Sequence, residues 1–406
     1  MKSGTRFLLA ARQCEIAELE QLARGSALVT ATSRFIHALQ RERGTSNIYL
    51  VSHGERFARQ RAELAAASAE AEHAVRAEFE KLDTEGLGLR NGARLFSRVA
   101  VVVHDCDGLP AIRARIGNHA VAAAEASAAF SRLIAGLLAV VFEAADAATD
   151  PEVSKALVAL FSFMQGKELA GQERALGARA FAAGHAEPAL VQQWHHLVDS
   201  QQANFRAFAD FSDAQVLRVD RASRSPAVQA ELERLRYVGC TPGPLDAELA
   251  QPWYEVCTQR IDAMKSVEDF LTAHLRSLCE ARIAQARTEL HDQRAQLHDL
   301  AARAPQGEAG GAPPYGPQLE RSILWMVHEQ AQRLQAMGDE LEAVRAALNE
   351  RKVVDRAKGL LMAHRGMSEG EAYKALRQMA MNQNRRLVDV ADAVLSLADV
   401  LPGGTR

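Results

Sequence analysis

The chain has 406 residues, of which 48% are hydrophobic and 24% charged, and its formal net charge is −3. Five scattered cysteines without a C-x-x-C pair suggest neither a disulfide framework nor a zinc site, and they indicate a reducing compartment. The length predicts two or more domains with packed cores, and the alanine- and leucine-rich composition predicts an all-α fold.

No targeting or membrane-spanning segment is expected. The N-terminal run FLLAA is too short for a signal-peptide core, and no small-residue cleavage site follows it. The longest apolar stretch, residues 133–142, is shorter than a membrane span requires. The sequence therefore predicts a cytoplasmic protein without a membrane partner.

Residues 5–303 carry long amphipathic segments and predict a large N-terminal helical bundle. Glycine, proline and capping residues interrupt the helical pattern at residues 86–92, 149–151, 225–226 and 241–244. Each interruption predicts the end of one helix and the start of another.

Three arginines of this region lie on or beside apolar or small-residue helix faces. Arg43 interrupts the stripe formed by Ile36, Leu39, Ser46 and Leu50. Arg174 lies about a quarter turn from a small-residue face formed by Gly166, Ala170 and Gly177. Arg236 lies similarly beside the apolar stripe of residues 228–239. We expect these guanidinium groups to be at least partly buried, and the glycines to admit a close helix or a small ligand.

A buried guanidinium remains charged and needs a negative partner. Glu42 and Glu173 are adjacent in sequence to Arg43 and Arg174, so internal ion pairs are one solution. A small anion from outside is the other. The residue pattern alone leaves both open.

Residues 304–318, APQGEAGGAPPYGPQ, replace the helical pattern with glycine and proline and predict a linker. The domain that follows spans residues 319–399 and begins with a heptad seam, made of Ile323, Val327, Gln330, Leu334, Met337, Leu341, Val344 and Leu348. Such a seam predicts a coiled-coil stem, and a homodimer is its simplest product. An intramolecular helical hairpin is the alternative.

The C-terminal part predicts a small module of three helices. The first ends at Arg365-Gly366, a basic turn followed by a permissive glycine. Ser368 and Glu371 form a capping box that starts the second. A polar run at residues 382–384 separates it from a third helix that begins near Leu387.

Charge distinguishes this module from the remainder of the chain. Residues 350–387 hold nine Lys and Arg against four Asp and Glu, a net charge of +5, so the remaining residues carry −8. A local basic surface on an otherwise acidic protein is typical of a nucleic-acid backbone binder. Solvated helix faces are the alternative interpretation.

Residues 350–387 resemble the ANTAR RNA-binding domain of transcription antiterminators. The resemblance rests on Glu350-Arg351, residues 357–362 (AKGLLM), Gly366, Ala372, Leu376-Arg377, Ala380-Met381 and residues 384–387 (NRRL). It implies binding to paired hairpins in leader mRNA, with contacts from Lys358, Gly359, Arg377, Met381 and Arg385. The receiver domain that many such proteins carry is not indicated, so control by phosphorylation is not expected.

Residues 40–46 (QRERGTS) and 164–177 (MQGKELAGQERALG) resemble the NIT nitrate- and nitrite-sensing domain. The resemblance implies an all-helical sensor in which Arg43, Arg174 and Arg236 hold the anion. Nitrate suits planar guanidinium forks, because it is planar, singly charged and offers three acceptor oxygens.

Together the two resemblances imply a nitrate- or nitrite-responsive antitermination regulator. Its sensor would signal through its last helix, around residues 271–300, and free or reorient the RNA-binding module. We expect no cofactor apart from this effector. An enzyme is not expected, because His195-His196 and the residues 104–107 lack ligand or triad spacing. An anion-responsive DNA-binding regulator or a helical scaffold is the alternative.

Overall fold

The structure, a computed structural model, describes residues 4–82, 92–146, 148–302, 317–365, 367 and 369–400. Within these residues every regular element is helical, which confirms the all-α class. In chain order the helices are α1 (Gly4–Val51), α2 (Ala58–Glu80), α3 (Gly92–Asp107), α4 (Leu109–Gly117), α5 (Ala123–Asp146), α6 (Pro151–Ala183), α7 (Pro188–Phe211), α8 (Ala214–Ser223), α9 (Pro226–Cys240), the 3-10 turn η1 (Ala247–Leu249), α10 (Ala250–Ala302), α11 (Pro317–Arg365), α12 (Glu369–Gln383) and α13 (Leu387–Val400).

Several helix boundaries follow from local side-chain chemistry. Asp150 caps α6 by accepting from the backbone N–H groups of Glu152 and Val153, with Pro151 in the first turn. Ser225 and Pro226 begin α9 in the same way. These two predicted breaks and the one at residues 241–244 are confirmed, whereas residues 86–91 lie outside the described part.

Two hydrophobic cores share the helices α6 and α10. The larger core is formed mainly by α1, α5, α6 and α10, and its fully buried residues include Phe35, Ile36, Leu39, Leu137, Leu160, Phe163 and Leu275. The smaller core lies at the other end of α6, against α7, α9 and the start of α10, and includes Phe181, Trp194, Leu235 and Trp253. Both helices therefore contribute residues to both cores, and α6 also carries Arg174.

The predicted close approach at the glycines of α6 is explained by aromatic rings. A Cβ on Gly166 would lie 2.7 Å from the Phe205 ring of α7, and one on Gly177 would lie 2.4 Å from the Trp253 ring of α10. At these two positions the glycine therefore makes room for packing rather than for a ligand.

One helix of the described residues, α5, is long and apolar enough by composition to cross a membrane, and 56% of its most apolar window is buried inside the protein. This segment is longer than the apolar run expected from the sequence. Its apolar character is accounted for by packing, because Phe130, Leu133 and Leu137 are buried in the larger core.

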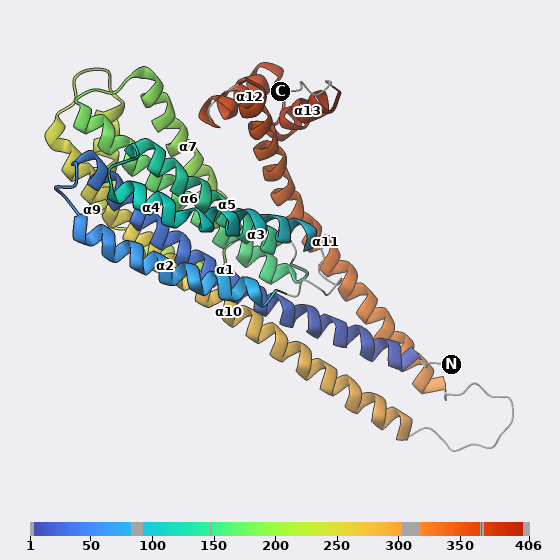
Figure 1. Cartoon of the computed structure of the whole chain (residues 1–406). Coiled ribbons are helices and arrows are strands. Elements are labelled where there is room, and N and C mark those ends of the chain that lie inside the picture. The colour runs from blue at the N-terminus through green and yellow to red at the C-terminus, as the bar shows by residue number, and fades with distance from the viewer. Residues whose placement is uncertain are drawn as a thin grey trace.

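The helix α11 runs back along the bundle from the free ends of α1 and α10 and carries α12 and α13 at its far end (Figure 1). Its seam residues Gln330, Leu341 and Val344 are buried within the same chain. Arg345 donates to the Ala148 carbonyl at 3.2 Å, and Lys155 of α6 forms an ion pair with Glu340. The described seam thus packs partly intramolecularly, while Leu334 is 50% exposed.

The C-terminal module, defined here as residues 350–400, has a small core of its own. Ala357, Leu361, Leu376, Val390 and Ala391 from its three helices are buried together. The three predicted helices are confirmed, with Leu387 starting the third. The predicted Gly366 turn and the Ser368 cap lie outside the described residues.

Candidate functional site

Arg43 lies in a buried ion pair that links α1 to α6. Its Nη1 and Nη2 donate to Glu168 Oε1 and Oε2 at 2.5 and 3.1 Å, and Nη1 also donates to Ser131 Oγ of α5 at 2.7 Å. Glu168 accepts further hydrogen bonds from Gln40 at 2.8 Å and Gln172 at 3.0 Å. The expected burial of Arg43 is correct, and its partner is a carboxylate one helix away.

Arg174 has different partners. Its Nη1 donates to Thr258 Oγ1 of α10 at 3.0 Å, and its guanidinium lies 4.9 Å from the centre of the Tyr254 ring. No ion pair between Arg174 and a carboxylate is present in the described part of the chain. A buried or half-buried cation without its own carboxylate is the feature expected of an anion-binding arginine.

The two guanidinium groups reach across the α1–α6 contact in opposite directions. A Cβ on Gly171 would lie 3.0 Å from Arg43 Nη2, and a Cβ on Gly44 would lie 3.0 Å from Arg174 Nη2. Each arginine therefore occupies space that a glycine leaves open, and that glycine is close in sequence to the other arginine. The structure brings Arg43 and Arg174 to the same helix crossing.

Arg236 belongs to a separate buried cluster. Its Nε and Nη2 each donate to Glu173 at 2.6 Å, and Glu173 also accepts from Trp194 at 3.0 Å and Gln201 at 2.7 Å. Burial opposes ionisation of Glu173, but the hydrogen bonds and charge of Arg236 outweigh it and lower the pKa of this carboxyl. Among the described residues, Arg236 donates hydrogen bonds to Glu173 and Glu233 and to neither Arg43 nor Arg174 or their partners.

The expected ion pairs between sequence neighbours are wrong. Glu42 pairs with Arg113 of α4 at 2.8 Å rather than with Arg43, and Glu173 pairs with Arg236 rather than with Arg174. The physical reason is helical geometry, because consecutive residues of a helix do not face each other. Arg43 and Arg236 have internal carboxylate partners, as one of the two alternatives required, whereas Arg174 has no carboxylate partner among the described residues.

Arg260 is a buried arginine of α10 that the sequence analysis did not single out. It donates to Gln201 Oε1 at 2.9 Å and lies 3.8 Å from Glu173, which Arg236 already occupies. Burial, followed by the charge of Arg236, lowers the pKa of Arg260 to about 10. The signal that marked Arg43 would also have marked Arg260, because Val256, Cys257 and Met264 lie three or four residues away on the same helical face.

A second polar layer lies one or two turns along the same helices. Lys167 of α6 and Glu268 of α10 are both fully buried and form an ion pair at 2.6 Å, and Ser33 donates to Glu268 at 2.7 Å. Burial, followed by the charges of Lys167 and Lys265, lowers the pKa of His37 to about 3, so this histidine is neutral. The layer holds α1, α6 and α10 together beside the arginines.

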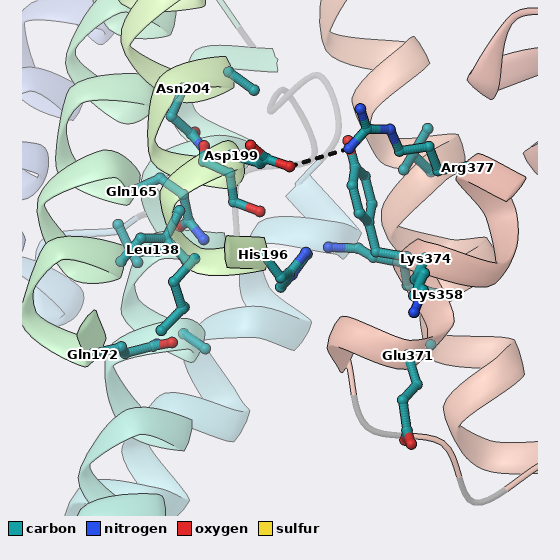
Figure 2. Close-up of a pocket in the computed structure, with 18 of the residues that line it drawn as sticks. Leu138, Gln165, Gln172, His196, Asp199, Asn204, Lys358, Glu371, Lys374 and Arg377 are labelled. Carbon is teal, nitrogen blue, oxygen red and sulfur yellow. Dashed lines mark hydrogen bonds and ion pairs between the residues drawn. The ribbon is translucent and has the colours of Figure 1, made fainter. Parts of the chain in front are cut away.

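The module faces the bundle across a cleft of about 2290 Å³. Figure 2 shows Lys358, Lys374 and Arg377 of the module opposite His196 and Asp199 of α7. Arg377 pairs with Asp199 at 3.1 Å, Lys374 donates to Gln192 at 3.2 Å, and the Tyr373 ring lies 5.1 Å from the His196 ring.

The residues expected to contact RNA fall into two groups. Lys358, Gly359 and Arg377 line the cleft. Met381 is 67% exposed and Arg385 is also exposed, both outside the cleft lining. The face that carries Lys358 and Arg377 is thus directed toward the bundle, while part of the basic surface is open to solvent.

Comparison with known proteins places these features in a family. Residues 34–276 match the NIT family, described as nitrate and nitrite sensing, and residues 342–395 match the ANTAR domain. The chain is 35% identical over 393 residues to the nitrate regulatory protein of Klebsiella oxytoca, covering 95% of this chain and 93% of that protein. Over 60 residues, 15% of this chain and 29% of the relative, it is 38% identical to the transcriptional regulatory protein PdtaR of Mycobacterium tuberculosis.

Its fold also has a solved counterpart. The structure of the NasR transcription antiterminator aligns with a TM-score of 0.63 at 34% identity, over 98% of this chain and 99% of that one. Both resemblances inferred from the sequence are confirmed. With a sensor and an RNA-binding module in the same order and nearly complete coverage, the chain belongs to the family of nitrate-responsive antitermination regulators that join a NIT domain to an ANTAR domain.

Proposed function

We propose that nitrate or nitrite binds between Arg43 and Arg174 and thereby controls binding of leader RNA by the C-terminal module. The observation that supports this most directly is Arg174, a cation at the α1–α6 contact that lacks a carboxylate partner among the described residues. A planar anion can accept from both guanidinium forks, which come from different helices. Arg236 can join the site only if its pair with Glu173 opens.

The module binds RNA through Lys358, Gly359, Arg377, Met381 and Arg385, which remain the proposed contact residues. Basic side chains hold the phosphates, and exposed loop bases of a hairpin are read by shorter contacts. In the docked arrangement Lys358 and Arg377 line the cleft opposite α7, where the bundle blocks the approach of a rigid RNA helix. Anion binding therefore favours a state in which the module leaves α7.

The signal travels along α6 rather than only through α10. One end of α6 holds Lys155, which pairs with Glu340 of α11, and the middle of the same helix holds Glu168 and Arg174. The separation of Lys155 and Arg174 along the helix is about 28 Å at a rise of about 1.5 Å per residue. A shift of α6 near Arg174 therefore also moves Lys155, which contacts α11.

A gel-shift titration of the leader RNA with and without nitrate tests this function. Full-length protein is expected to retain RNA more strongly with nitrate. Arg174→Ala removes a charge-assisted contact, which is worth about 1.5–3 kcal/mol, so nitrate binding weakens roughly tenfold or more while basal RNA retention stays. RNA retention that ignores nitrate in the wild-type protein contradicts the proposal.

Lys358→Ala and Arg385→Ala are the matched variants of the module. Both are expected to weaken RNA retention while nitrate binding, measured by calorimetry, is unchanged. Loss of both activities in either variant indicates misfolding. A double-stranded DNA competitor in the same gel distinguishes RNA binding from the DNA-binding alternative.

The protein acts in the cytoplasm, where nascent transcripts are made, as a regulator rather than an enzyme. A homodimer through α11 remains part of the proposal, because Leu334 and Trp325 on this helix are 50% and 64% exposed. Sedimentation of Leu334→Glu against wild-type protein tests it.

A further inference from the structure

Glu168 already occupies the guanidinium fork of Arg43, which the proposed anion also needs. Four N–H donors surround its carboxylate: two from Arg43 at 2.5 and 3.1 Å, one from Gln40 at 2.8 Å and one from Gln172 at 3.0 Å. The residue is only 3% exposed. A carboxylate is planar, singly negative and presents two oxygens, so it matches a guanidinium fork as nitrate or nitrite does.

We propose, on the basis of the proposed function, that Glu168 is an internal competitor that holds Arg43 until nitrate displaces it. Arg43 also donates to Ser131, and that hydrogen bond can persist when the carboxylate leaves. Glu168 in turn keeps the amide donors of Gln40 and Gln172 after Arg43 turns away. The exchange therefore leaves no buried charge without hydrogen bonds.

The charge balance explains why two arginines serve one anion. With nitrate absent, Arg43, Arg174 and Glu168 sum to +1 at the α1–α6 contact. One bound nitrate brings this local sum to zero. With only Arg43 and Glu168 present, the same anion would create a buried net negative charge, which a protein interior disfavours.

The exchange also links binding to helix position. Glu168 and Arg174 belong to α6, whereas Arg43 belongs to α1, so the Arg43–Glu168 pair fixes one helix to the other. Replacing this pair by an anion shared between Arg43 and Arg174 moves the contact on α6 from Glu168 to Arg174, which lie about 1.7 turns apart at about 3.6 residues per turn. Glu168 thus sets both the nitrate affinity and the resting register of the two helices.

Calorimetric titration of full-length Glu168→Gln with nitrate tests the proposal. The amide has nearly the same shape but no charge, so nitrate is expected to bind more tightly than to wild type, by roughly 5- to 150-fold, which corresponds to a coupling free energy of about 1–3 kcal/mol. Glu168→Asp keeps the charge and is expected to bind nitrate within a few-fold of wild type. A residue that only supports the fold gives weaker binding in both variants.

Glu42→Gln is the matched control. Glu42 is also buried and accepts hydrogen bonds from Nε and Nη2 of Arg113, so it faces α4 instead of the proposed site. This variant is expected to lose stability with unchanged nitrate affinity. Thermal unfolding with and without nitrate provides a second measure, because tighter binding to Glu168→Gln raises the midpoint more than in wild type.

The possible results separate the two proposals. Unchanged or weaker nitrate binding in folded Glu168→Gln, with normal binding in wild type, overturns the internal-competitor role and leaves the proposed function intact. Absence of nitrate binding in wild type overturns the proposed function itself. Tighter binding in Glu42→Gln as well as in Glu168→Gln shows a general charge effect and also rejects the specific role.

Discussion

The arginines of the sensor and those of the RNA-binding module are held in opposite ways. The side chains of Arg43 and Glu168 are 7% and 4% exposed, whereas those of Arg377 and Asp199 are 58% and 53% exposed. Removing one partner of a buried ion pair lowers the stability of the fold by about 3–5 kcal/mol, while an exposed pair contributes about 0–1 kcal/mol to it. The buried pair therefore holds α1 and α6 in one arrangement until a competing anion replaces it, as proposed above, whereas the exposed pair between the module and α7 opens at little cost.

The largest expected effect comes from removing a buried carboxylate. Glu173→Ala leaves Arg236 and Arg260 buried without their shared partner, and the free energy of unfolding is expected to fall by about 3–5 kcal/mol. Chemical denaturation of the full chain measures this. A loss below about 1 kcal/mol would place this pair with the exposed ones and remove the contrast.

Lowering the pH provides a second test, at the buried polar layer that contains His37. The pKa of His37 is lowered from 6.5 to about 3, so the unfolded chain binds a proton that the folded chain does not, and stability falls as the pH falls below about 6.5. The contribution reaches about 1.4 kcal/mol near pH 5.5, from about 1.36 kcal/mol per pH unit.

His37→Asn is expected to flatten this slope, which a series of denaturation curves between about pH 5 and 7.5 detects. Other groups that face His37 are Lys167, Lys265, Glu268 and Arg41, and none of them is altered in the variant. An identical slope in both proteins rules out His37 as its source.

The contact between the start of the module and the bundle should have an intermediate effect. Lys352 donates to Asp146 at 2.7 Å and lies 4.9 Å from the centre of the Phe142 ring, with both partners on α5. Lys352→Met is expected to weaken docking by about 1 kcal/mol, the size of one partly desolvated cation contact. Hydrogen exchange of α7 and α12 without nitrate should then increase; unchanged protection means that Lys352 does not hold the module.

The smallest effect is expected at the exposed pair. Asp199→Ala removes the partner of Arg377 without touching the module, so RNA retention without nitrate should rise by a factor of about two to five, since exposed pairs contribute about 0–1 kcal/mol. Stability should be unaffected. A rise as large as that caused by nitrate would show that this single contact carries the docking.

Much of the fold was predictable because its signals are local. Asp150-Pro151 and Ser225-Pro226 start helices through their own side chains, and Leu387 resumes an apolar pattern after a polar break. The burial of Arg43 and Arg236 followed from the apolar stripes on which they lie. None of these inferences needs knowledge of a distant residue.

The partners of those arginines were not predictable from neighbours in the chain. Arg43 is separated from Glu168 by 125 positions and Arg236 from Glu173 by 63. Which helix lies beside which is decided by packing of the two cores, including rings that fit against Gly166 and Gly177. The docking of the module on α7 is equally a tertiary property, since no local pattern joins Arg377 to Asp199.

The sharing of α6 between both cores has a consequence for how sensitivity can change over evolution. Substitutions at Leu160 in the larger core or Leu176 in the smaller core change how tightly α6 packs against its neighbours, without altering the proposed anion-binding residues. The nitrate concentration needed for a response can therefore change through substitutions of hydrophobic core residues, while the proposed anion-binding arginines stay the same.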